Sequence, residues 1–190
     1  MISQYNLANA WRRKGEPWKA IDLFEEALEK GRHKPGADHP ATVDATFDLA
    51  VTYDDLKMLE KAIPLYEDVL KERKKKLGPD HRDTLRVMSY LAAAYSQQKD
   101  KLETALTLFT EIYERRNDKL GRENQDTLKS MYAVALAEKM TNKLEESLNR
   151  FQELLPLLEK REPLPEGYPQ ISDTKKQIAE ILSLVQPKQQ

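Results

Sequence analysis

Residues 49–53, Leu-Ala-Val-Thr-Tyr, decide the fold because their pattern recurs at a nearly constant spacing. Residues 7–11, which lie 42 positions earlier, read Leu-Ala-Asn-Ala-Trp, and residues 91–95, which lie 42 positions later, read Leu-Ala-Ala-Ala-Tyr. A further 43 positions on, residues 134–138 read Val-Ala-Leu-Ala-Glu, with Glu138 in the aromatic place. Four copies at this period predict a repeat protein in which each copy is one supersecondary unit.

A second pattern recurs in the other half of each unit. A small residue is followed four positions later by an aromatic one in all four copies: Ala20 and Phe24, Ala62 and Tyr66, Ala105 and Phe109, Ser147 and Phe151. From Ala62 onward, apolar residues fall at i, i+3, i+4, i+7 and i+8, which is typical of an amphipathic helix. The joints between the two halves are short and polar, so we expect the two helices of a unit to be antiparallel neighbours.

These patterns predict two helices in each unit. The first helices are expected at about 2–14, 40–55, 82–97 and 125–140, and their partners at about 17–33, 59–77, 101–119 and 144–161. Gly36, Gly78 and Gly121 lie where a residue with left-handed backbone would end the second helix. Pro156 is expected to kink or end the fourth partner helix.

The C-terminal part departs from the repeat pattern. Residues 162–169, Glu-Pro-Leu-Pro-Glu-Gly-Tyr-Pro, predict a linker because they cannot hold regular structure. Apolar residues at helical spacing then predict one more amphipathic helix, which would cover the last apolar face of the array. The expected organisation is an array over residues 1–161, with repeats at about 1–38, 39–80, 81–123 and 124–161, a Pro-rich linker at 162–169, a capping helix at 170–186 and a tail at 187–190.

Composition narrows the class of protein. Leu occurs 26 times and Gly only 6 times in 190 residues, so we expect an all-α chain. The absence of cysteine excludes disulfide scaffolds, thiolate zinc sites and cysteine nucleophiles. Because 31 basic and 32 acidic residues nearly cancel, no global positive field would attract nucleic acid. No apolar run is long enough to cross a bilayer and no signal-peptide pattern is present, so a soluble cytoplasmic protein without a membrane partner is expected.

The repeated residues resemble the tetratricopeptide repeat, whose first helix carries a Leu, a small residue and an aromatic, and whose second helix carries Ala and Phe. The 42-residue period is similar to that of kinesin light chain and of related bacterial regulators, which share a Leu-Gly end and a His-Pro-x-Thr start. Here those marks are Leu77-Gly78, Leu120-Gly121 and residues 39–42, His-Pro-Ala-Thr. The resemblance implies a right-handed α-α superhelix of four helix-turn-helix repeats with a capping helix, in which the first helices line a concave groove.

The resemblance also implies which side chains face this groove. The candidates for partner binding are Asn6, Asn9, Arg12, Arg13, Asp44, Asp48, Asp54, Asp55, Arg86, Tyr90, Lys129 and Leu136. The second repeat contributes four carboxylates between cationic rims, and such a pattern would select a partner by charge. The alternative is that these are solvated helix faces. The carboxylate clamp that grips chaperone tails is excluded, because Asp48 stands where the clamp needs Asn and would repel a terminal carboxylate.

The sequence contains no pattern for catalysis or metal binding. His39 and His81 are repeat-equivalent and lie at inter-repeat joints, and neither they nor His33 have metal-ligand spacing, so structural roles are expected. Gly-rich phosphate loops, His-Glu-x-x-His and nucleophile motifs are absent, so we expect no enzyme, cofactor or metal. Residues 71–76, Lys-Glu-Arg-Lys-Lys-Lys, could touch nucleic acid, but a solvated helix end favoured by the helix dipole is the preferred interpretation.

The sequence therefore predicts a non-enzymatic module that binds a protein or peptide segment in the concave groove, as part of a larger signalling or scaffold protein. Two alternatives stay open. A self-associating module would form a homodimer, and a regulatory domain would belong to a longer bacterial kinase or regulator. The array begins at Met1 without a covering segment, which we expect of a module from a longer chain.

Overall fold

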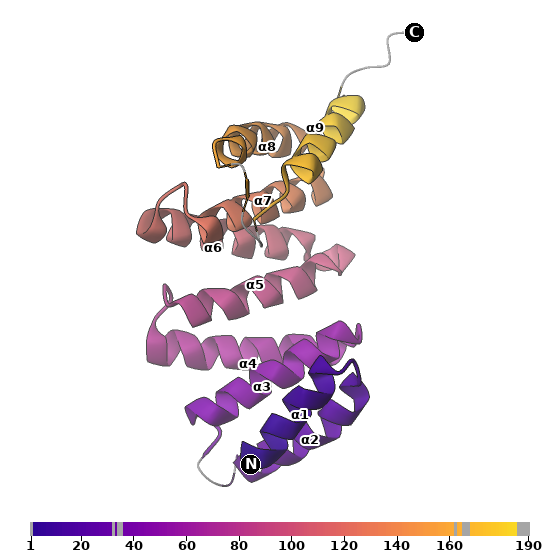
Figure 1. The fold of residues 1–190 in the computed structure, drawn as a ribbon, viewed down its shortest axis with the longest axis vertical. Coiled ribbons are helices and arrows are strands. Elements are labelled where there is room, and N and C mark those ends of the chain that lie inside the picture. Colours follow the sequence, from indigo (N-terminus) through magenta and orange to yellow (C-terminus); the bar gives the residue numbers. More distant parts are fainter. Residues whose placement is uncertain (1, 32, 34–35, 162, 165–167, 186–190) are drawn as a thin grey trace. The chain divides into compact units, whose positions relative to one another are not determined.

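The computed structural model describes residues 2–31, 33, 36–161, 163–164 and 168–185. Every secondary-structure element in this part of the chain is a helix, so the predicted all-α fold class is confirmed (Figure 1). The helices belong to two compact units, residues 1–94 and 95–190.

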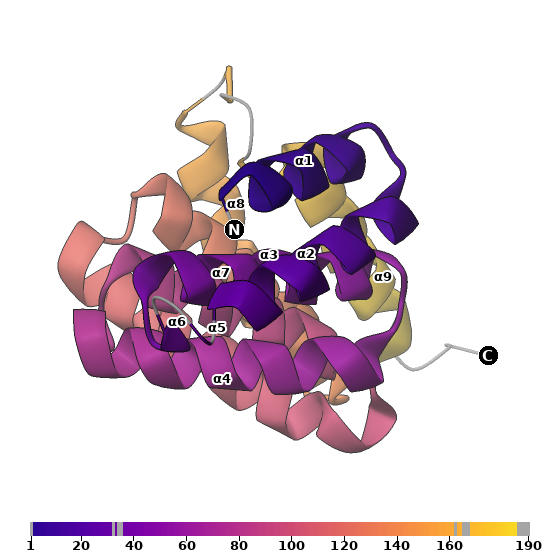
Figure 2. The same ribbon diagram turned by 90° about the horizontal axis from the view of Figure 1, so that it is seen from below.

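The first unit is built from two helical hairpins and a fifth helix. Helix α1 (Ile2–Arg13) packs against α2 (Pro17–Gly31), and α3 (Pro40–Asp55) packs against α4 (Leu59–Leu77). Helix α2 also packs against α3, so the two hairpins are stacked (Figure 1, Figure 2). Helix α5 (Arg82–Ser96) follows, and only its last two residues belong to the second unit.

The recurring small and aromatic residues form the core of the first unit. The fully buried members of the pattern are Ala8, Ala20, Phe24, Ala50, Ala62 and Tyr66. The alanines allow neighbouring helices to approach closely, and the aromatic rings fill the remaining space between hairpins. The pattern that predicts the repeats is thus a packing pattern.

Equivalent residues begin the first helices of successive repeats. The Nδ1 atom of His39 accepts a hydrogen bond from the amide two residues further on (3.2 Å), and His81 does the same (3.2 Å). In the second unit the Oδ1 atom of Asn124 accepts the equivalent bond (2.9 Å). These bonds satisfy amide donors that have no partner within the helix. His39 and His81 therefore have the structural role that their repeat equivalence predicts.

Glycine ends the second helices with a backbone conformation that differs from the predicted one. Gly78 has φ 89° and ψ 164°, and Gly121 has φ 83° and ψ 160°. A left-handed helical residue would have a ψ of about 47°. The observed angles instead fall in an extended, positive-φ region that is essentially restricted to glycine. The chain therefore leaves each helix in an extended direction, toward the start of the next repeat.

The described part of the second unit continues with a 3₁₀ turn and four α-helices. A short turn of 3₁₀-helix, η2 (Lys99–Lys101), leads into α6 (Leu102–Leu120), which packs against α7 (Gln125–Met140). Helix α8 (Leu144–Glu159) packs against both α7 and α9 (Ile171–Val185). The core is a cluster of fully buried residues from these last three helices: Leu128, Met131, Ala135, Phe151, Leu154, Leu158 and Ile181. Helix α9 thus buries its apolar face at the end of the array.

The two proline-containing stretches near the C-terminus behave differently. Pro156 lies inside α8, and the helix ends one turn later, where the amide of Lys160 bonds the Pro156 carbonyl (3.1 Å). Within the predicted linker, Leu164 and Tyr168 are described and pack against the core cluster. Residues 162 and 165–167, and the predicted tail at 187–190, lie outside the described residues.

Candidate functional site

Asp48, a predicted groove residue on α3, is held by three side chains of α1. Its carboxylate accepts hydrogen bonds from the hydroxyl of Tyr5 (2.6 Å) and the amide of Asn9 (3.3 Å). It also forms an ion pair with Arg12 (3.7 Å), and the Arg12 guanidinium donates to the side-chain oxygen of Asn9 (3.4 Å). The fold therefore brings together three of the predicted residues, but they are bonded to one another.

The bond to Asp48 also affects the acidity of Tyr5. Burial, followed by the hydrogen bond and the negative charge of Asp48, raises the pKa of Tyr5 to about 12. The hydroxyl therefore stays protonated and remains a donor at neutral pH. The ring of Tyr5 packs edge-on against the buried Phe24, with 5.9 Å between centroids, so this side chain is fixed at both ends.

Asp44 is bound by an arginine from the second helix of its own repeat. Arg73 of α4 is only 5% exposed, and its guanidinium lies 2.7 Å from the Asp44 carboxylate. The guanidinium also donates to the carbonyl of Asp83 (3.1 Å) and lies over the ring of Phe47 (5.1 Å). A buried charge requires such partners. Because Arg73 belongs to the basic run at 71–76, the interpretation of this run as a solvated helix end is wrong at that residue.

Three aromatic rings lie at the centre of the candidate surface of the first unit. Phe47 and Tyr66 are buried, whereas Tyr90 on α5 is 38% exposed. The ring of Tyr90 contacts those of Phe47 (5.2 Å, edge to face) and Tyr66 (5.9 Å). Arg86, one helical turn before Tyr90, lies over the Phe47 ring at 5.0 Å. The candidates Tyr90 and Arg86 are therefore neighbours, and both reach solvent.

The remaining candidates of the first unit are less constrained. Asp54 is half-buried and accepts a long hydrogen bond from the Tyr66 hydroxyl (3.4 Å). Asn6, Arg13 and Asp55 are exposed. Two of the four carboxylates in the second repeat are thus neutralised internally, which reduces the acidic character that we predict for this repeat.

The two candidates of the second unit both lie on α7 but differ in their surroundings. Lys129 is exposed, whereas Leu136 is half-buried and packs against the core cluster. One turn after Leu136, the ammonium of Lys139 donates to Gln177 (2.7 Å) and Glu180 (2.5 Å) of α9. The hydrogen bond and charge of Lys139 lower the pKa of Glu180. Helix α9 therefore contacts the first-helix face of the last repeat, and Leu136 has a packing role there.

Sequence reasoning missed the bonds that hold this surface in place, chiefly those of Tyr5 and Arg73. For Arg73 the sequence contains a signal, because Arg116 occupies the equivalent position 43 residues later. In the structure Arg116 donates to the carbonyl of Asp126 (3.3 Å). This bond is equivalent to the one that Arg73 makes. For Tyr5 no signal identified the partner, because its bond to Asp48 depends on how the two hairpins stack.

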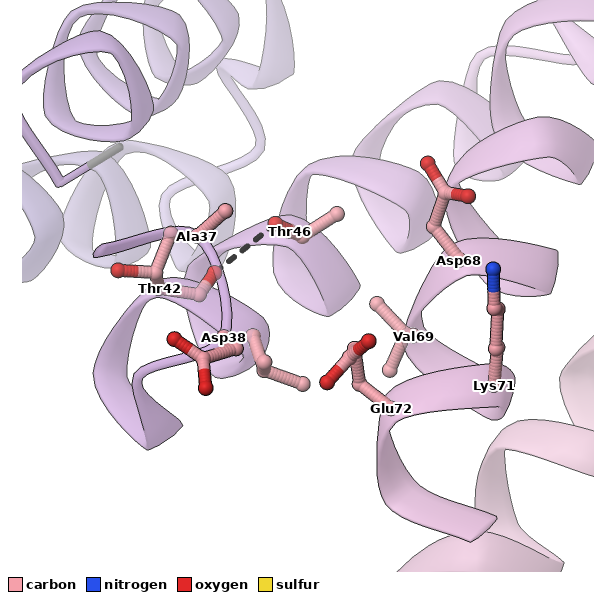
Figure 3. A pocket seen from close by; sticks show the side chains of 9 residues that line it. Ala37, Asp38, Thr42, Thr46, Asp68, Val69, Lys71 and Glu72 are labelled. Carbon is pink, nitrogen blue, oxygen red and sulfur yellow. Dashed lines mark hydrogen bonds between the residues drawn. The ribbon is translucent and has the colours of Figure 1, made fainter. Parts of the chain in front are cut away.

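A separate recess of about 210 Å³ lies between the loop before α3 and the α3–α4 hairpin (Figure 3). Asp38, Asp68 and Glu72 contribute carboxylates to its lining, and the Thr46 hydroxyl bonds the Thr42 carbonyl (2.9 Å). None of the predicted site residues lines this recess.

The described residues offer neither a metal site nor a membrane span. Within the described ranges, no group of three or more His, Asp or Glu side chains could hold a metal ion. His33, which pairs with Glu29 at 3.2 Å, is exposed. Among the helices that the structure describes, none is both long and apolar enough to cross a bilayer.

Stacked antiparallel hairpins whose small and aromatic core residues recur every 42 or 43 positions define a helical repeat protein. The chain belongs to the tetratricopeptide repeat family, whose model matches residues 1–75 and 55–118. This confirms the resemblance on which the groove positions rest. Members of the family generally act as protein–protein interaction modules and are typically non-enzymatic scaffolds.

Solved structures share this fold. A kinesin light chain-type protein of Podosopora anserina with nearly identical TPR-like repeats is 22% identical, with 95% of this chain and 84% of that chain covered and a TM-score of 0.79. BtubC (BKLC) from P. vanneervenii is 20% identical, with 96% and 72% covered and a TM-score of 0.77. The apo form of RapI is 14% identical, with 96% and 63% covered and a TM-score of 0.81. No curated protein matches the chain.

Proposed function

We propose that this chain is a docking module that binds a segment of a partner protein on the first-helix face of its repeats. The main support for the proposal is that Tyr90 is both exposed and fixed in position. Its side chain is 38% exposed, yet its ring is held against the buried rings of Phe47 and Tyr66. An aromatic side chain that is already ordered loses little conformational freedom when a partner covers it, which is typical of interface hot spots.

Arg86 supports the same surface. Its side chain is 52% exposed, and its ion pair with Asp83 is long, at 3.6 Å. Exposed ion pairs of this kind contribute little to stability, so Arg86 can exchange Asp83 for a group on a partner. Aromatic and Arg side chains are enriched in interface cores. We therefore expect Tyr90 and Arg86 to contribute most of the binding free energy in the first unit.

The internal bonds decide which substitutions can test this proposal. A change at Asp48 would remove the partner of Tyr5, Asn9 and Arg12 and would disturb the packing of α1 on α3. Loss of binding in such a variant would have two explanations. Tyr90 and Arg86 are better targets because both are exposed and neither is part of the Asp48 network.

The test is partner capture from a lysate of the source organism, with circular dichroism as a check of folding. We would compare the wild type, the double variant Tyr90→Ser, Arg86→Glu, and the control Leu184→Ser, which changes a 62% exposed apolar residue on α9. We expect a protein that the wild type and the control retain and the folded double variant loses. Identical proteins in all three captures would show that the first-helix face of the first unit is only a solvated surface.

A further inference from the structure

Trp18 breaks the repeat pattern at an exposed position. It is the second residue of α2 and is 62% exposed. The equivalent places in the other repeats hold Glu60, Glu103 and Glu145, each exposed in the first turn of a second helix. A carboxylate there interacts favourably with the helix dipole, whereas an exposed indole places a large apolar surface in water. Packing among the described residues leaves Trp18 largely exposed, which points to a contact with another molecule.

The turn between α1 and α2, seen at the edge of the first unit in Figure 2, is cationic. Lys14 and Lys19 hold their ammonium groups over the ring of Trp11, at 5.0 and 4.4 Å from its centroid. Both also pair with Glu16, whose pKa is lowered, chiefly by the hydrogen bond from Lys19. Arg13 is exposed and has no ion pair within the described part of the chain. Three cations and one carboxylate therefore lie next to the exposed indole in the sequence.

A recess of opposite character lies on the same unit. It has a volume of about 520 Å³ and opens between α2, α3 and α4. Its apolar lining includes Leu65, and its charged lining consists of Glu25, Glu29 and Glu60 with the single ammonium of Lys61. The recess is large enough for an indole ring, and carboxylates outnumber cations in its lining.

We propose that the Trp18 turn of one copy of this chain docks into this recess on a second copy. The indole fills the apolar part of the recess, and the cations of the turn face its carboxylates. Burial of an exposed Trp and complementary charge both favour this association. The net charge of −1 gives little repulsion between copies. Arg13 is the one residue of this contact that is also a groove candidate, and neither Tyr90 nor Arg86 belongs to the contact, so self-association leaves those two side chains open.

The Trp18 turn and the recess lie near each other on one copy, so two copies can form a closed dimer. Trp18 and Glu25 both lie on α2, seven residues apart, which corresponds to about 10 Å along the helix axis. Two copies related by a two-fold axis can therefore make the contact twice, each giving its turn and receiving the other. A geometry that does not close in this way would propagate into longer assemblies.

The test is the mass of the full chain as a function of concentration, measured by sedimentation velocity and light scattering. We expect the mass to rise from 22.0 kDa toward twice this value. Trp18→Glu, which installs the residue of the other repeats and so preserves the fold, should weaken association about tenfold or more. Glu60→Lys and added salt should also weaken it, whereas Tyr90→Ser should associate as the wild type does.

The charge arrangement gives an independent check. In a mixture of Lys19→Glu and Glu60→Lys chains, the unchanged cationic turn of the second variant faces the unchanged acidic recess of the first, so we expect the mixture to associate more strongly than either variant alone. A wild type that stays at 22.0 kDa at every concentration would overturn the proposal. Association that survives Trp18→Glu unchanged would also overturn it. Assemblies larger than a dimer that dissociate when Trp18→Glu is introduced would support the contact. They would also show that the contact joins copies into open chains and does not form a closed two-fold dimer.

Discussion

The guanidinium of Arg150 binds the carboxylate of Glu138 through three hydrogen bonds of 2.7 to 3.1 Å. Glu138 is only 6% exposed, and it occupies the place where the other repeats have Trp11, Tyr53 and Tyr95. The hydrogen bond and charge of Glu138 raise the pKa of Arg150, which therefore stays charged. The last repeat tolerates a carboxylate in an aromatic position because α8 supplies its arginine.

We expect this ion pair to be replaceable as a pair but not singly. Glu138→Ala leaves Arg150 without its partner and should lower the free energy of unfolding by about 3–5 kcal/mol. The double variant Glu138→Tyr, Arg150→Leu installs the residues of the second repeat, Tyr53 and Leu65, and should equal or exceed the wild-type stability. Urea unfolding of the wild type, the single variants and the double variant checks this. A double variant as unstable as Glu138→Ala would contradict it.

Glycine at the ends of α4 and α6 is expected to be irreplaceable by alanine. Gly78→Ala and Gly121→Ala should each lower the free energy of unfolding by about 1–3 kcal/mol. A Cβ atom would meet nothing within 4 Å at either position, so the loss arises from backbone strain. Denaturant unfolding measures the loss, and D-alanine, which favours positive φ, should restore stability at Gly78. Equal destabilisation by both forms of alanine would point to a steric clash instead.

The turns inside the hairpins offer an opportunity to stabilise the chain. Lys57 and Asn142 both have φ 62° at the place where the first repeat has Gly15 with φ 82°. Lys57→Gly should raise the free energy of unfolding by about 0.5–1 kcal/mol, because it removes strain that exceeds the entropy loss of glycine. Asn tolerates this conformation better than Lys, so Asn142→Gly should gain less. Thermal unfolding of both variants checks the order, and a larger gain at Asn142 would refute it.

Alkaline pH is expected to destabilise the first unit through Tyr5. Its pKa rises from 10.0 to about 12 on folding, so its contribution to stability is complete below pH 10 and is lost as the pH approaches 12. Tyr5→Phe lacks the titrating hydroxyl and should lose less stability over this interval. At neutral pH the variant should be less stable than the wild type by about 1 kcal/mol, because Asp48 loses a donor. Urea unfolding across this pH range checks both, and parallel curves would contradict the assignment to Tyr5.

The sequence could predict the helices because their signals are periodic and local. The Leu-Ala-aromatic pattern that begins at Leu49 reports packing against the nearest neighbours, and such packing repeats with the chain. The sequence predicts a helix end at Gly78, but it does not predict the ψ of Gly78, because that angle depends on where the next helix starts. The sequence does not predict that Arg73 is buried, because Arg73 belongs to a basic run and sequence alone does not show which cation of the run turns inward.

The candidate site was predictable as a set of positions but not as a set of bonds. The sequence assigns the charge of Asp48 to a partner, whereas in the structure three side chains of α1 already bind it. These bonds join residues about 40 positions apart, and their formation depends on the rotation of one hairpin against the next. The sequence also does not predict the packing role of Leu136, because the packing of α9 decides whether the first-helix face of the last repeat is open.

The contacts of Arg73 and Arg116 have a consequence for the order of the repeats. Each donates to a carbonyl at the start of the following first helix, and the equivalent residue of the last repeat is Leu158, which is fully buried with Ile181 of α9. In the second and third repeats an arginine at this position contacts the repeat that follows, and in the last repeat a leucine contacts the terminal helix, whereas the first repeat has Gly31 there. The repeats are therefore not interchangeable building blocks. A chain shuffled so that the third repeat preceded α9 would place a guanidinium where α9 needs an apolar surface.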